Sequence, residues 1–299
     1  MVASAESNVG NSIAEHAYSY YPGCSLHATA AEYDVSTRLV CQKLGIELRE
    51  LEDWVCCGAS AAHSTDHLLS LALPAHTLKQ AEEKGLPLAV PCAMCYSRLR
   101  FALHELKNKD TLDLVSRVVG KELSTAVTVK PMLQVLADES ISLPIVKPLS
   151  ELKVACYYGC LLVRPPEVVG FDDAENPQTM ERLMERLGAE AIDWGLKTSC
   201  CGAGVAFARF DIVLKLSHRL LMMAQRSGAD CIAVSCPMCH ANLDMYQKDM
   251  TAKYKQKTEL PVLYFTQLMG LALGFSHKEL LLNKHLTDPL PMLRNKKLI

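Results

Sequence analysis

Short apolar runs alternate with longer amphipathic stretches along the chain, and the same order occurs twice. The runs predict buried strands, and the stretches with apolar residues every three or four positions predict helices. The strands expected from the runs lie at 17–22, 46–51, 87–91, 152–158, 190–193 and 230–235. The helices expected between them lie at 28–44, 65–84, 94–107, 177–187, 208–227 and 238–249. This order is typical of two tandem α/β domains with mainly parallel sheets flanked by helices.

Glycine, proline and asparagine residues predict several helix boundaries. Gly45 and Gly188 follow two of the helical patterns and are expected to end them. Asn176 is the expected N-cap of the helix over 177–187, with Pro177 at its first position. Pro74 predicts a kink in the helix over 65–84.

The two halves also resemble each other in sequence, which indicates a duplicated domain. LGIE at 44–47 corresponds to LGAE at 187–190, and EKGLPLAVPCAMC at 83–95 corresponds to RSGADCIAVSCPMC at 226–239. The expected organisation is a flexible N-terminus at 1–16, a first domain at 17–138, a linker at 139–150, and a second domain with a C-terminal tail at 151–299.

Composition narrows the class of protein. A chain of 299 residues that is 49% hydrophobic can bury two ordinary cores. The 31 basic and 33 acidic residues give no electrostatic reason to bind nucleic acid, and the basic end RNKKLI is expected to be a solvated or partner-bound terminus. The first sixteen residues lack a secretory signal, and no apolar run is long enough for a membrane span. We therefore expect a cytoplasmic, soluble protein.

Ten of the thirteen cysteines form one five-cysteine pattern written twice. Each copy has a first cysteine, a twin pair followed by glycine, and a C-x-x-C pair thirty-four residues later: Cys24, Cys56, Cys57, Cys92 and Cys95, then Cys160, Cys200, Cys201, Cys236 and Cys239. In a reducing compartment so many cysteines are poor candidates for structural disulfides. Fixed spacing favours metal clusters, and structural zinc and redox-active dithiols remain the alternatives.

The predicted topology places these cysteines where sites form in open α/β sheets, at the carboxyl ends of strands and the amino ends of helices. Free backbone N–H groups there stabilise thiolates. Twin cysteines can share one site only where the backbone turns sharply, and Gly58 and Gly202 permit such a turn. A mononuclear zinc site uses four ligands and has no evident role for a fifth cysteine, whereas a polynuclear iron-sulfur cluster does.

The repeated pattern resembles the CCG domain, and two such domains resemble the family of B subunits of CoB-CoM heterodisulfide reductases. The resemblance covers about residues 17–270, and stretches such as YYPGCSLHATAAEYD and RPPEVVGFDDAENP are similar to its bacterial branch. It implies that each five-cysteine set holds a non-cubane [4Fe-4S] cluster. It also implies that a substrate disulfide lies between the two clusters and is cleaved there to two thiols.

Other residues have weaker patterns. Cys41, Cys156 and Cys231 are expected to pack as small apolar side chains, although Cys156 is close enough to Cys160 in sequence to substitute as a ligand. Several side chains near the motifs are candidates for supporting roles: His27, His63, His67 and His240 as a proton donor, with His27 and His63 preferred; Arg164 and Arg209 for an anionic substrate; and Trp54 and Trp194 for packing around the clusters.

Two functions follow from these patterns. The first is the disulfide-reducing catalytic subunit of a heterodisulfide-reductase-like complex, supplied with electrons by an iron-sulfur subunit of the C type and a flavin subunit of the A type. The second is an electron-transfer CCG subunit of a lactate, glycolate or succinate oxidoreductase or a sulfur-oxidising complex. No G-x-G-x-x-G follows an expected strand, so either function requires a partner that supplies electrons.

Overall fold

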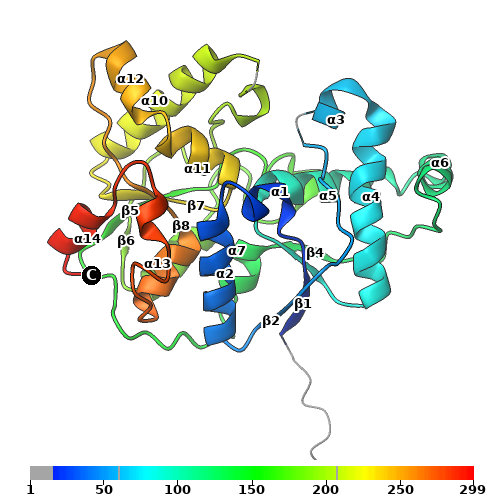
Figure 1. The fold of residues 1–299 in the computed structure, drawn as a ribbon, viewed down its shortest axis with the longest axis horizontal. Coiled ribbons are helices and arrows are strands. Elements are labelled where there is room, and N and C mark those ends of the chain that lie inside the picture. The colour runs from blue at the N-terminus through cyan, green and yellow to red at the C-terminus, as the bar shows by residue number, and fades with distance from the viewer. Residues whose placement is uncertain (1–15, 60, 207) are drawn as a thin grey trace, which may run out of the picture.

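The computed structural model describes residues 16–59, 61–206 and 208–299, and it contains two similar α/β halves (Figure 1). The elements of the first half are β1 (Ala17–Tyr20), α1 (Gly23–His27), α2 (Ala31–Lys43), β2 (Glu47–Glu50), α3 (Ala61–Thr65), α4 (His67–Lys84), β3 (Leu88–Val90), α5 (Ala93–Glu105), α6 (Lys109–Val119), β4 (Val129–Pro131) and α7 (Met132–Leu136). Those of the second half are β5 (Lys153–Tyr157), α8 (Pro166–Val169), α9 (Thr179–Arg186), β6 (Glu190–Ala191), η1 (Ala203–Val205), α10 (Phe210–Arg226), β7 (Cys231–Val234), α11 (Pro237–Asp244), α12 (Gln247–Tyr254), β8 (Val262–Tyr264), α13 (Phe265–Ala272), η2 (Leu282–Lys284) and α14 (Leu290–Asn295).

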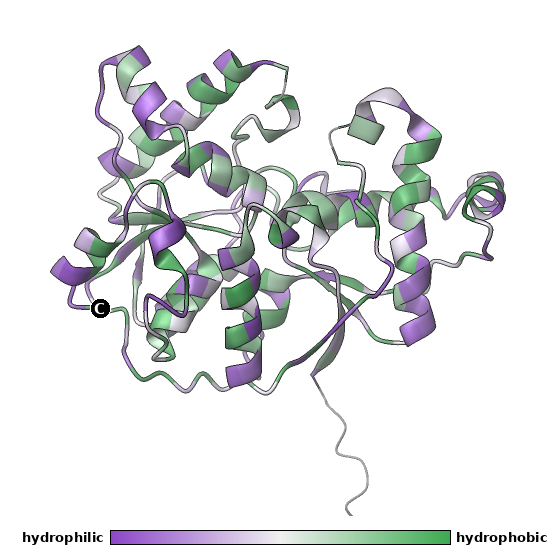
Figure 2. Ribbon diagram, viewed as in Figure 1, coloured by the Kyte–Doolittle hydropathy of each residue, from purple (hydrophilic) through white to green (hydrophobic). Residues whose placement is uncertain are grey.

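Each half is built on a four-stranded parallel sheet. The strand orders are β2-β1-β3-β4 and β6-β5-β7-β8, so the second sheet repeats the first. In the first sheet Ser19 of β1 pairs with Leu88 of β3, and in the second Val154 of β5 pairs with Cys231 of β7. The two inner strands of each sheet are almost wholly buried and consist largely of hydrophobic residues (Figure 2). The predicted fold class, two tandem α/β domains with parallel sheets, is confirmed.

The apolar pattern locates three strands of each sheet and misses the fourth. The missed strands, β4 and β8, have three residues each, and β4 contains Pro131. The helix expected at 238–249 is wrong as a single element, because α11 ends at Asp244 and α12 begins at Gln247. α4 continues as one helix through Pro74.

The predicted start of α9 is also wrong. Gln178, not Asn176, is the N-cap residue, and the helix begins at Thr179. The carboxylate of Asp172 accepts hydrogen bonds from the backbone N–H groups of Gln178 and Thr179, at 3.0 and 2.9 Å. A side chain from a preceding loop therefore satisfies the free N–H groups that the expected N-cap would have bonded.

The boundaries 17–138, 139–150 and 151–299 stay a prediction. Residues 139–150 contain no helix or strand, yet they pack on the second half, since the N–H groups of Val146 and Lys147 donate to the carbonyl of Ala272. Residues 1–15, most of the segment predicted to be flexible, lie outside the described residues. Within the described ranges, no helix has the length and apolar character needed to cross a membrane.

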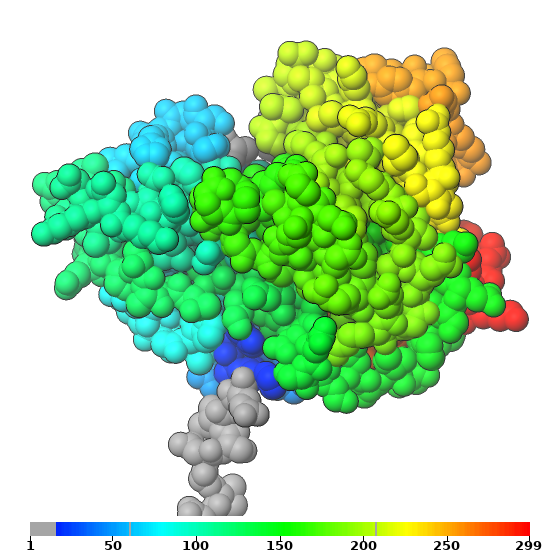
Figure 3. Space-filling view, turned by 180° about the vertical axis from the view of Figure 1, so that it is seen from behind, coloured from blue at the N-terminus to red at the C-terminus, as the bar shows by residue number. Residues whose placement is uncertain are grey.

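The two halves pack tightly against each other. α2 lies along α13, and the hydroxyls of Ser36 and Thr266 are hydrogen-bonded across this contact at 2.7 Å. On α5, the hydroxyl of Tyr96 donates to the carbonyl of Val169 in the second half at 2.6 Å. Seen from behind, the middle of the chain, in green, fills the space between the two ends of the molecule (Figure 3). One continuous core therefore fixes the position of each half relative to the other.

Candidate metal centres

The motif cysteines follow the carboxyl ends of the inner strands of both sheets. Cys24 lies in α1 just after β1, and Cys92 is the N-cap residue of α5 after β3. In the second half Cys160 follows β5, and Cys236 is the N-cap residue of α11 after β7. Parallel strands end at the same edge of a sheet, so each half collects its cysteines at one place.

A glycine before each first cysteine allows the chain to approach the C-x-x-C pair closely. Gly23 has φ of +72°, and a Cβ built on it would lie 3.1 Å from the Sγ of Cys95. Gly159 has φ of +66°, and its Cβ would lie 3.2 Å from the Sγ of Cys239. Both the backbone conformation and the close sulfur favour glycine at these two positions.

A tyrosine three residues before each first cysteine holds the loop that carries the twin cysteines. The hydroxyl of Tyr21 donates to the carbonyl of Val55 at 2.8 Å, and that of Tyr157 donates to the carbonyl of Ser199 at 2.7 Å. Val55 and Ser199 are the residues immediately before the twin pairs. Sequence reasoning assigned these tyrosines no role, although their repeated spacing from the first cysteine was a signal for one.

The two tryptophans pack on these same tyrosines. Trp54 meets Tyr21 edge-on with ring centroids 5.5 Å apart, and Trp194 is tilted on Tyr157 at 6.0 Å. Trp194 also donates a hydrogen bond from Nε1 to the carbonyl of Cys156 at 2.9 Å. One tryptophan–tyrosine pair therefore packs beside each set of cysteines.

The twin cysteines connect the other members of each set. Gly58 and Gly202 follow the pairs with φ of +70° and +89°, as the sequence suggested. The Sγ atoms of Cys57 and Cys95 are 3.4 Å apart, and those of Cys201 and Cys239 are 3.5 Å apart. The remaining twin cysteine of each set contacts the first cysteine of that set: Cys56 contacts Cys24, and Cys200 contacts Cys160.

The two sets adjoin through one thiol from each half. The thiols of Cys92 and Cys236 are close enough that each shifts the pKa of the other. Hydrogen bonds link Cys92 to Cys95 in the first half and Cys236 to Cys239 in the second. A nearly continuous row of thiols therefore runs from one half to the other.

Hydrogen bonds lower the pKa of Cys56 in the first set and of Cys200 and Cys236 in the second. Hydrogen bonds from the Cys24 and Cys57 thiols and from the N–H of Gly58 lower the pKa of Cys56 to about 2. The Cys160 thiol and the N–H groups after Cys200 lower the pKa of Cys200 to about 6. Hydrogen bonds to these thiolates, burial and their negative charge raise the pKa of the neighbouring Cys24, Cys57 and Cys160 thiols, and a bound cation would favour their ionisation.

The arrangement of sulfur atoms fits a polynuclear centre better than a single metal ion. All thirteen cysteines are free thiols, and the 3.4 Å between the sulfur atoms of Cys57 and Cys95 is far beyond the S–S bond length of about 2.0 Å. Two thiolates on one tetrahedral metal lie about 3.8 Å apart, close to the observed pair spacing. Among the described residues, however, no three cysteines have all their sulfur atoms within 4.8 Å of one another. The sulfur atoms of each set are therefore more widely spread than the ligands of a single tetrahedral ion.

Three cysteines lie outside the two sets. Cys41, Cys156 and Cys231 are at most 1% exposed. Burial raises the pKa of the Cys41 thiol to about 12, and it also raises the pKa of Cys156 and Cys231. The thiol that contributes to the shift of Cys156 is Cys231, not Cys160. This placement favours apolar packing for all three.

The histidines named from the sequence have different surroundings. His27 is exposed, with Nε2 2.9 Å from the carboxylate of Glu50 and its ring edge-on to Trp54. His63 is exposed, with Nδ1 2.7 Å from the guanidinium of Arg98, and burial with the Arg98 charge lowers its pKa. His67 is exposed at the start of α4. His240 is buried against Tyr264, away from solvent.

The structure reveals a positively charged side chain near the first set of cysteines that the sequence reasoning missed. Arg98 lies three residues after Cys95 on α5. Its positive charge interacts electrostatically with the Cys57 thiol. Its Nε is buried and has no hydrogen-bond partner among the described residues. The spacing of three along a helix was a usable signal, since such residues share a face.

The two arginines named from the sequence are already paired. Arg164 contacts the carboxylate of Glu175 at 2.7 Å and the hydroxyl of Thr198 at 3.1 Å. Arg209 makes two hydrogen bonds to Asp211 at 2.9 Å on the exposed start of α10. Of the two, only Arg164 is hydrogen-bonded to the loop that carries Cys200 and Cys201, through Thr198.

Comparison with known proteins identifies the family. The model of the CCG cysteine-rich domain matches residues 18–100 and 154–244, which include all ten motif cysteines. The chain belongs to the CCG family of cysteine-rich domains. It resembles the B subunits of CoB-CoM heterodisulfide reductases in particular: it is 31% identical to the B subunit of the ferredoxin:CoB-CoM heterodisulfide reductase of Methanosarcina mazei, over 88% of this chain and 91% of that one.

Other relatives extend the range of complexes in which this family occurs. The CCG chain is 36% identical to the "8-methylmenaquinol:fumarate reductase membrane anchor subunit" of Wolinella succinogenes, over 91% of this chain and 97% of that one. A hypothetical protein from Helicobacter pylori, solved by crystallography, shares the fold with a TM-score of 0.76 at 14% identity. The match spans 92% of this chain and 52% of the Helicobacter protein. The relatives identify a redox subunit of the heterodisulfide reductase type or of a related CCG complex.

Proposed function

We propose that the ten motif cysteines hold two [4Fe-4S] clusters of the non-cubane kind. Cys24, Cys56, Cys57, Cys92 and Cys95 would bind one cluster, and Cys160, Cys200, Cys201, Cys236 and Cys239 the other. The five-thiol donor sets, their spread beyond a single tetrahedral ion, and the raised pKa of several thiols all support this assignment.

The function that this arrangement supports best is reduction of a disulfide to two thiols. The observation that carries it is the closeness of Cys92 and Cys236, which places the two sets side by side at the boundary between the halves. Cys24, Cys56 and Cys200 are exposed, so each set has a side that solvent and substrate reach. Bound clusters would supply the one-electron steps of this chemistry, in which a disulfide takes up two electrons and two protons.

Side chains beside the first set would serve the substrate and its protons. Arg98 brings a positive charge next to Cys57 and retains a buried N–H without a partner, which suits an anionic group of the substrate. His63 is held against Arg98, and His27 lies on α1 three residues after Cys24. These two histidines are the proposed routes for protons, with His27 also fixed by Glu50.

The electrons would come from partner subunits. The proposed partners are an iron-sulfur subunit of the C type and a flavin subunit of the A type, as in heterodisulfide reductase complexes. We place this complex in the cytoplasm, where a reducing environment preserves thirteen free cysteines.

A second candidate function is electron transfer without substrate chemistry on this chain. It is favoured by the 36% identity to a subunit of a Wolinella quinol:fumarate reductase, whose name assigns it to the membrane anchor. In that role the row of thiols from Cys24 to Cys201 would mark an electron path between partners.

Anaerobic turnover distinguishes the two candidates. The isolated holoprotein is given reduced viologen and a panel of disulfides, and release of thiols is measured together with reduction of quinones or dyes. We expect thiol release that falls by at least about 100-fold in Cys57→Ser and in Cys201→Ser, because each removes one of two interactions needed in the transition state. Cys41→Ala is the control and should keep its activity. Rapid electron transfer to a quinone with no disulfide turnover would favour the second function.

A further inference from the structure

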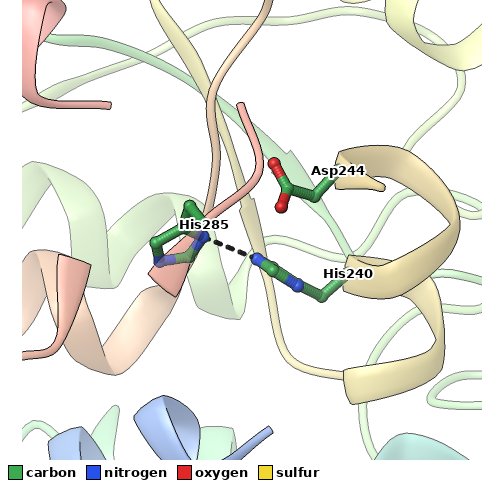
Figure 4. A group of neighbouring side chains, drawn as sticks. All are labelled: His240, Asp244 and His285. Atoms are coloured by element: carbon green, nitrogen blue, oxygen red, sulfur yellow. Dashed lines mark hydrogen bonds between the residues drawn. The ribbon is translucent and has the colours of Figure 1, made fainter. Parts of the chain in front are cut away.

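A second group of potential ligands lies outside the cysteine sets, in the second half. His240 and Asp244 are four residues apart on α11 and share one face of that helix. His285 follows η2 and faces them, as Figure 4 shows. Ligand atoms of the three side chains all lie within 4.8 Å of one another, and each residue is at most 7% exposed.

The hydrogen bonds around the group hold its ligand atoms close to one another. His285 Nε2 is 3.0 Å from the amide oxygen of Gln267, which makes Nε2 the donor and leaves a lone pair on Nδ1. That Nδ1 lies 2.9 Å from Nε2 of His240, and this Nε2 also donates to the carbonyl oxygen of Val262 at 3.1 Å. A histidine that ligates a metal generally donates its other N–H to an oxygen in this way.

The carboxylate of Asp244 is oriented by the backbone. Its two oxygens accept hydrogen bonds from the N–H groups of Leu286 at 2.7 Å and Thr287 at 3.0 Å. Each oxygen keeps a second lone pair, so this support is compatible with metal ligation. Hydrogen bonds from outside the group therefore orient all three of its side chains.

The charge balance of the group also points to a cation. Asp244 is 2% exposed and forms no salt bridge with lysine or arginine in the part of the chain that the structure describes. Burial raises the pKa of its carboxyl group. An ionised carboxylate buried beside two imidazoles is costly without a compensating positive charge.

An ion has a route to the group. A cavity of about 510 Å³, lined by residues that include His240, Asp244 and Leu286, opens next to α11. Asp244 also lines a second, larger cavity of about 1060 Å³ with Thr287. Two of the three ligands, His240 and Asp244, therefore line a cavity through which an ion could enter, and Asp244 lines both cavities.

We propose that His240, Asp244 and His285 bind one divalent transition-metal ion, separate from the two cysteine sets. Two imidazole nitrogens and one carboxylate oxygen suit Zn²⁺ or Fe²⁺, whereas Mg²⁺ and Ca²⁺ prefer oxygen ligands alone. Nitrogens on one tetrahedral zinc lie about 3.3 Å apart, so His240 and His285 need to separate by only a few tenths of an ångström. The ion would replace the proton that the two nitrogens share.

The ion would link the segment after η2 to α11, the helix whose N-cap residue is Cys236. Three protein ligands leave at least one coordination position for water from the cavity. Because Cys236 is the N-cap residue of α11 and Cys239 lies within the helix, the ion would also stiffen the support of the second cysteine set. It does not replace any cysteine ligand.

Metal analysis of the anaerobic holoprotein tests this site. The protein is titrated with Zn²⁺, separated from free ion, and analysed for zinc, iron and sulfide in wild type, His285→Gln, Asp244→Asn and the control His277→Gln. We expect one zinc per chain in wild type and in the control, none in the two site variants, and equal iron in all four. Absence of zinc from wild type, or equal zinc in the site variants, would overturn the proposal.

Two measurements on wild type alone keep the proposal testable if the variants fail to fold. X-ray absorption at the zinc edge should show nitrogen and oxygen neighbours at about 2.0 Å and no sulfur at about 2.3 Å. Sulfur neighbours would assign the zinc to cysteines and refute the site. Zinc at a hundredfold excess over its dissociation constant should also raise Tm by about 5 °C. An unchanged Tm would count against the linking role.

Discussion

The ring of Tyr33 on α2 lies flat against the ring of Tyr264 at the end of β8, with centroids 4.1 Å apart and 6° between the planes. This stack joins the first half of the molecule to the second. It lies beside the point where the two cysteine sets meet: burial raises the pKa of Tyr33, and the neighbouring Cys92 and Cys236 thiols raise it further. The relative position of the two sets therefore depends on an aromatic contact between the halves.

Removing this contact should destabilise the whole molecule. Tyr33→Ala deletes a fully buried ring, and we expect a loss of about 3–5 kcal/mol in the free energy of unfolding. Tyr33→Phe removes only the 3.0 Å hydrogen bond to the carbonyl of Pro91 and should cost about 1 kcal/mol. Anaerobic urea unfolding followed by circular dichroism measures both. Tyr254→Ala, on the half-buried end of α12, is the control; a similar loss in all three variants would contradict the assigned role of the stack.

Metal content follows from the doubled five-cysteine motif. Anaerobically prepared protein should contain about eight irons and eight sulfides per chain, from two clusters of four. Colorimetric iron and sulfide assays on protein of known concentration check this number. Little iron, with zinc bound to sulfur ligands instead, would exclude the cluster assignment.

The two sets should fill independently, because every ligand of each set comes from one half. Cys57→Ser should lose about four of the eight irons, and Cys201→Ser should lose the other four. Cys41→Ala, at a buried cysteine outside both sets, should lose none. Iron analysis with electron paramagnetic resonance of the reduced proteins identifies which cluster remains. If a single variant lost all its iron while its circular dichroism was unchanged, the ligand sets would have to be shared across Cys92 and Cys236.

The sequence predicted those features of the fold that depend on local pattern. The apolar runs located the inner strands, which are buried on both faces, and the glycines located several helix ends. The edge strands β4 and β8, of three residues each, were missed, and β4 contains Pro131, a residue that argues against a strand. The break between α11 and α12 was missed because Asp244 is held by the N–H groups of Leu286 and Thr287, which lie 42 and 43 residues later in the chain.

The site was predicted to a similar extent. Repetition identified the ten cysteines and their grouping in sequence, since each copy preserves the spacing. It gave no indication that Cys92 meets Cys236, because that contact depends on how the halves pack. Arg98 and the group around His240 were missed for the same reason: their partners come from other elements.

The glycines before the first cysteines offer a matched test of the local geometry. Gly23→Ala places a Cβ 3.1 Å from the Sγ of Cys95, in a backbone conformation with φ of +72°. Gly45→Ala meets a similar φ of +70° but no atom within 4 Å, so it serves as the control for backbone strain alone. Each substitution should cost about 1–2 kcal/mol through the left-handed conformation.

Only Gly23→Ala should also disturb the first set of cysteines. The added methyl group must displace the Cys95 sulfur or the α1 backbone, so we expect about half of the iron to be lost from this variant and none from Gly45→Ala. Gly159→Ala, whose Cβ would lie 3.2 Å from the Sγ of Cys239, should lose the other half. Iron content and urea unfolding, measured on all three variants, separate the two effects. Equal iron in Gly23→Ala and Gly45→Ala would mean that the close approach to Cys95 has no part in holding the cluster.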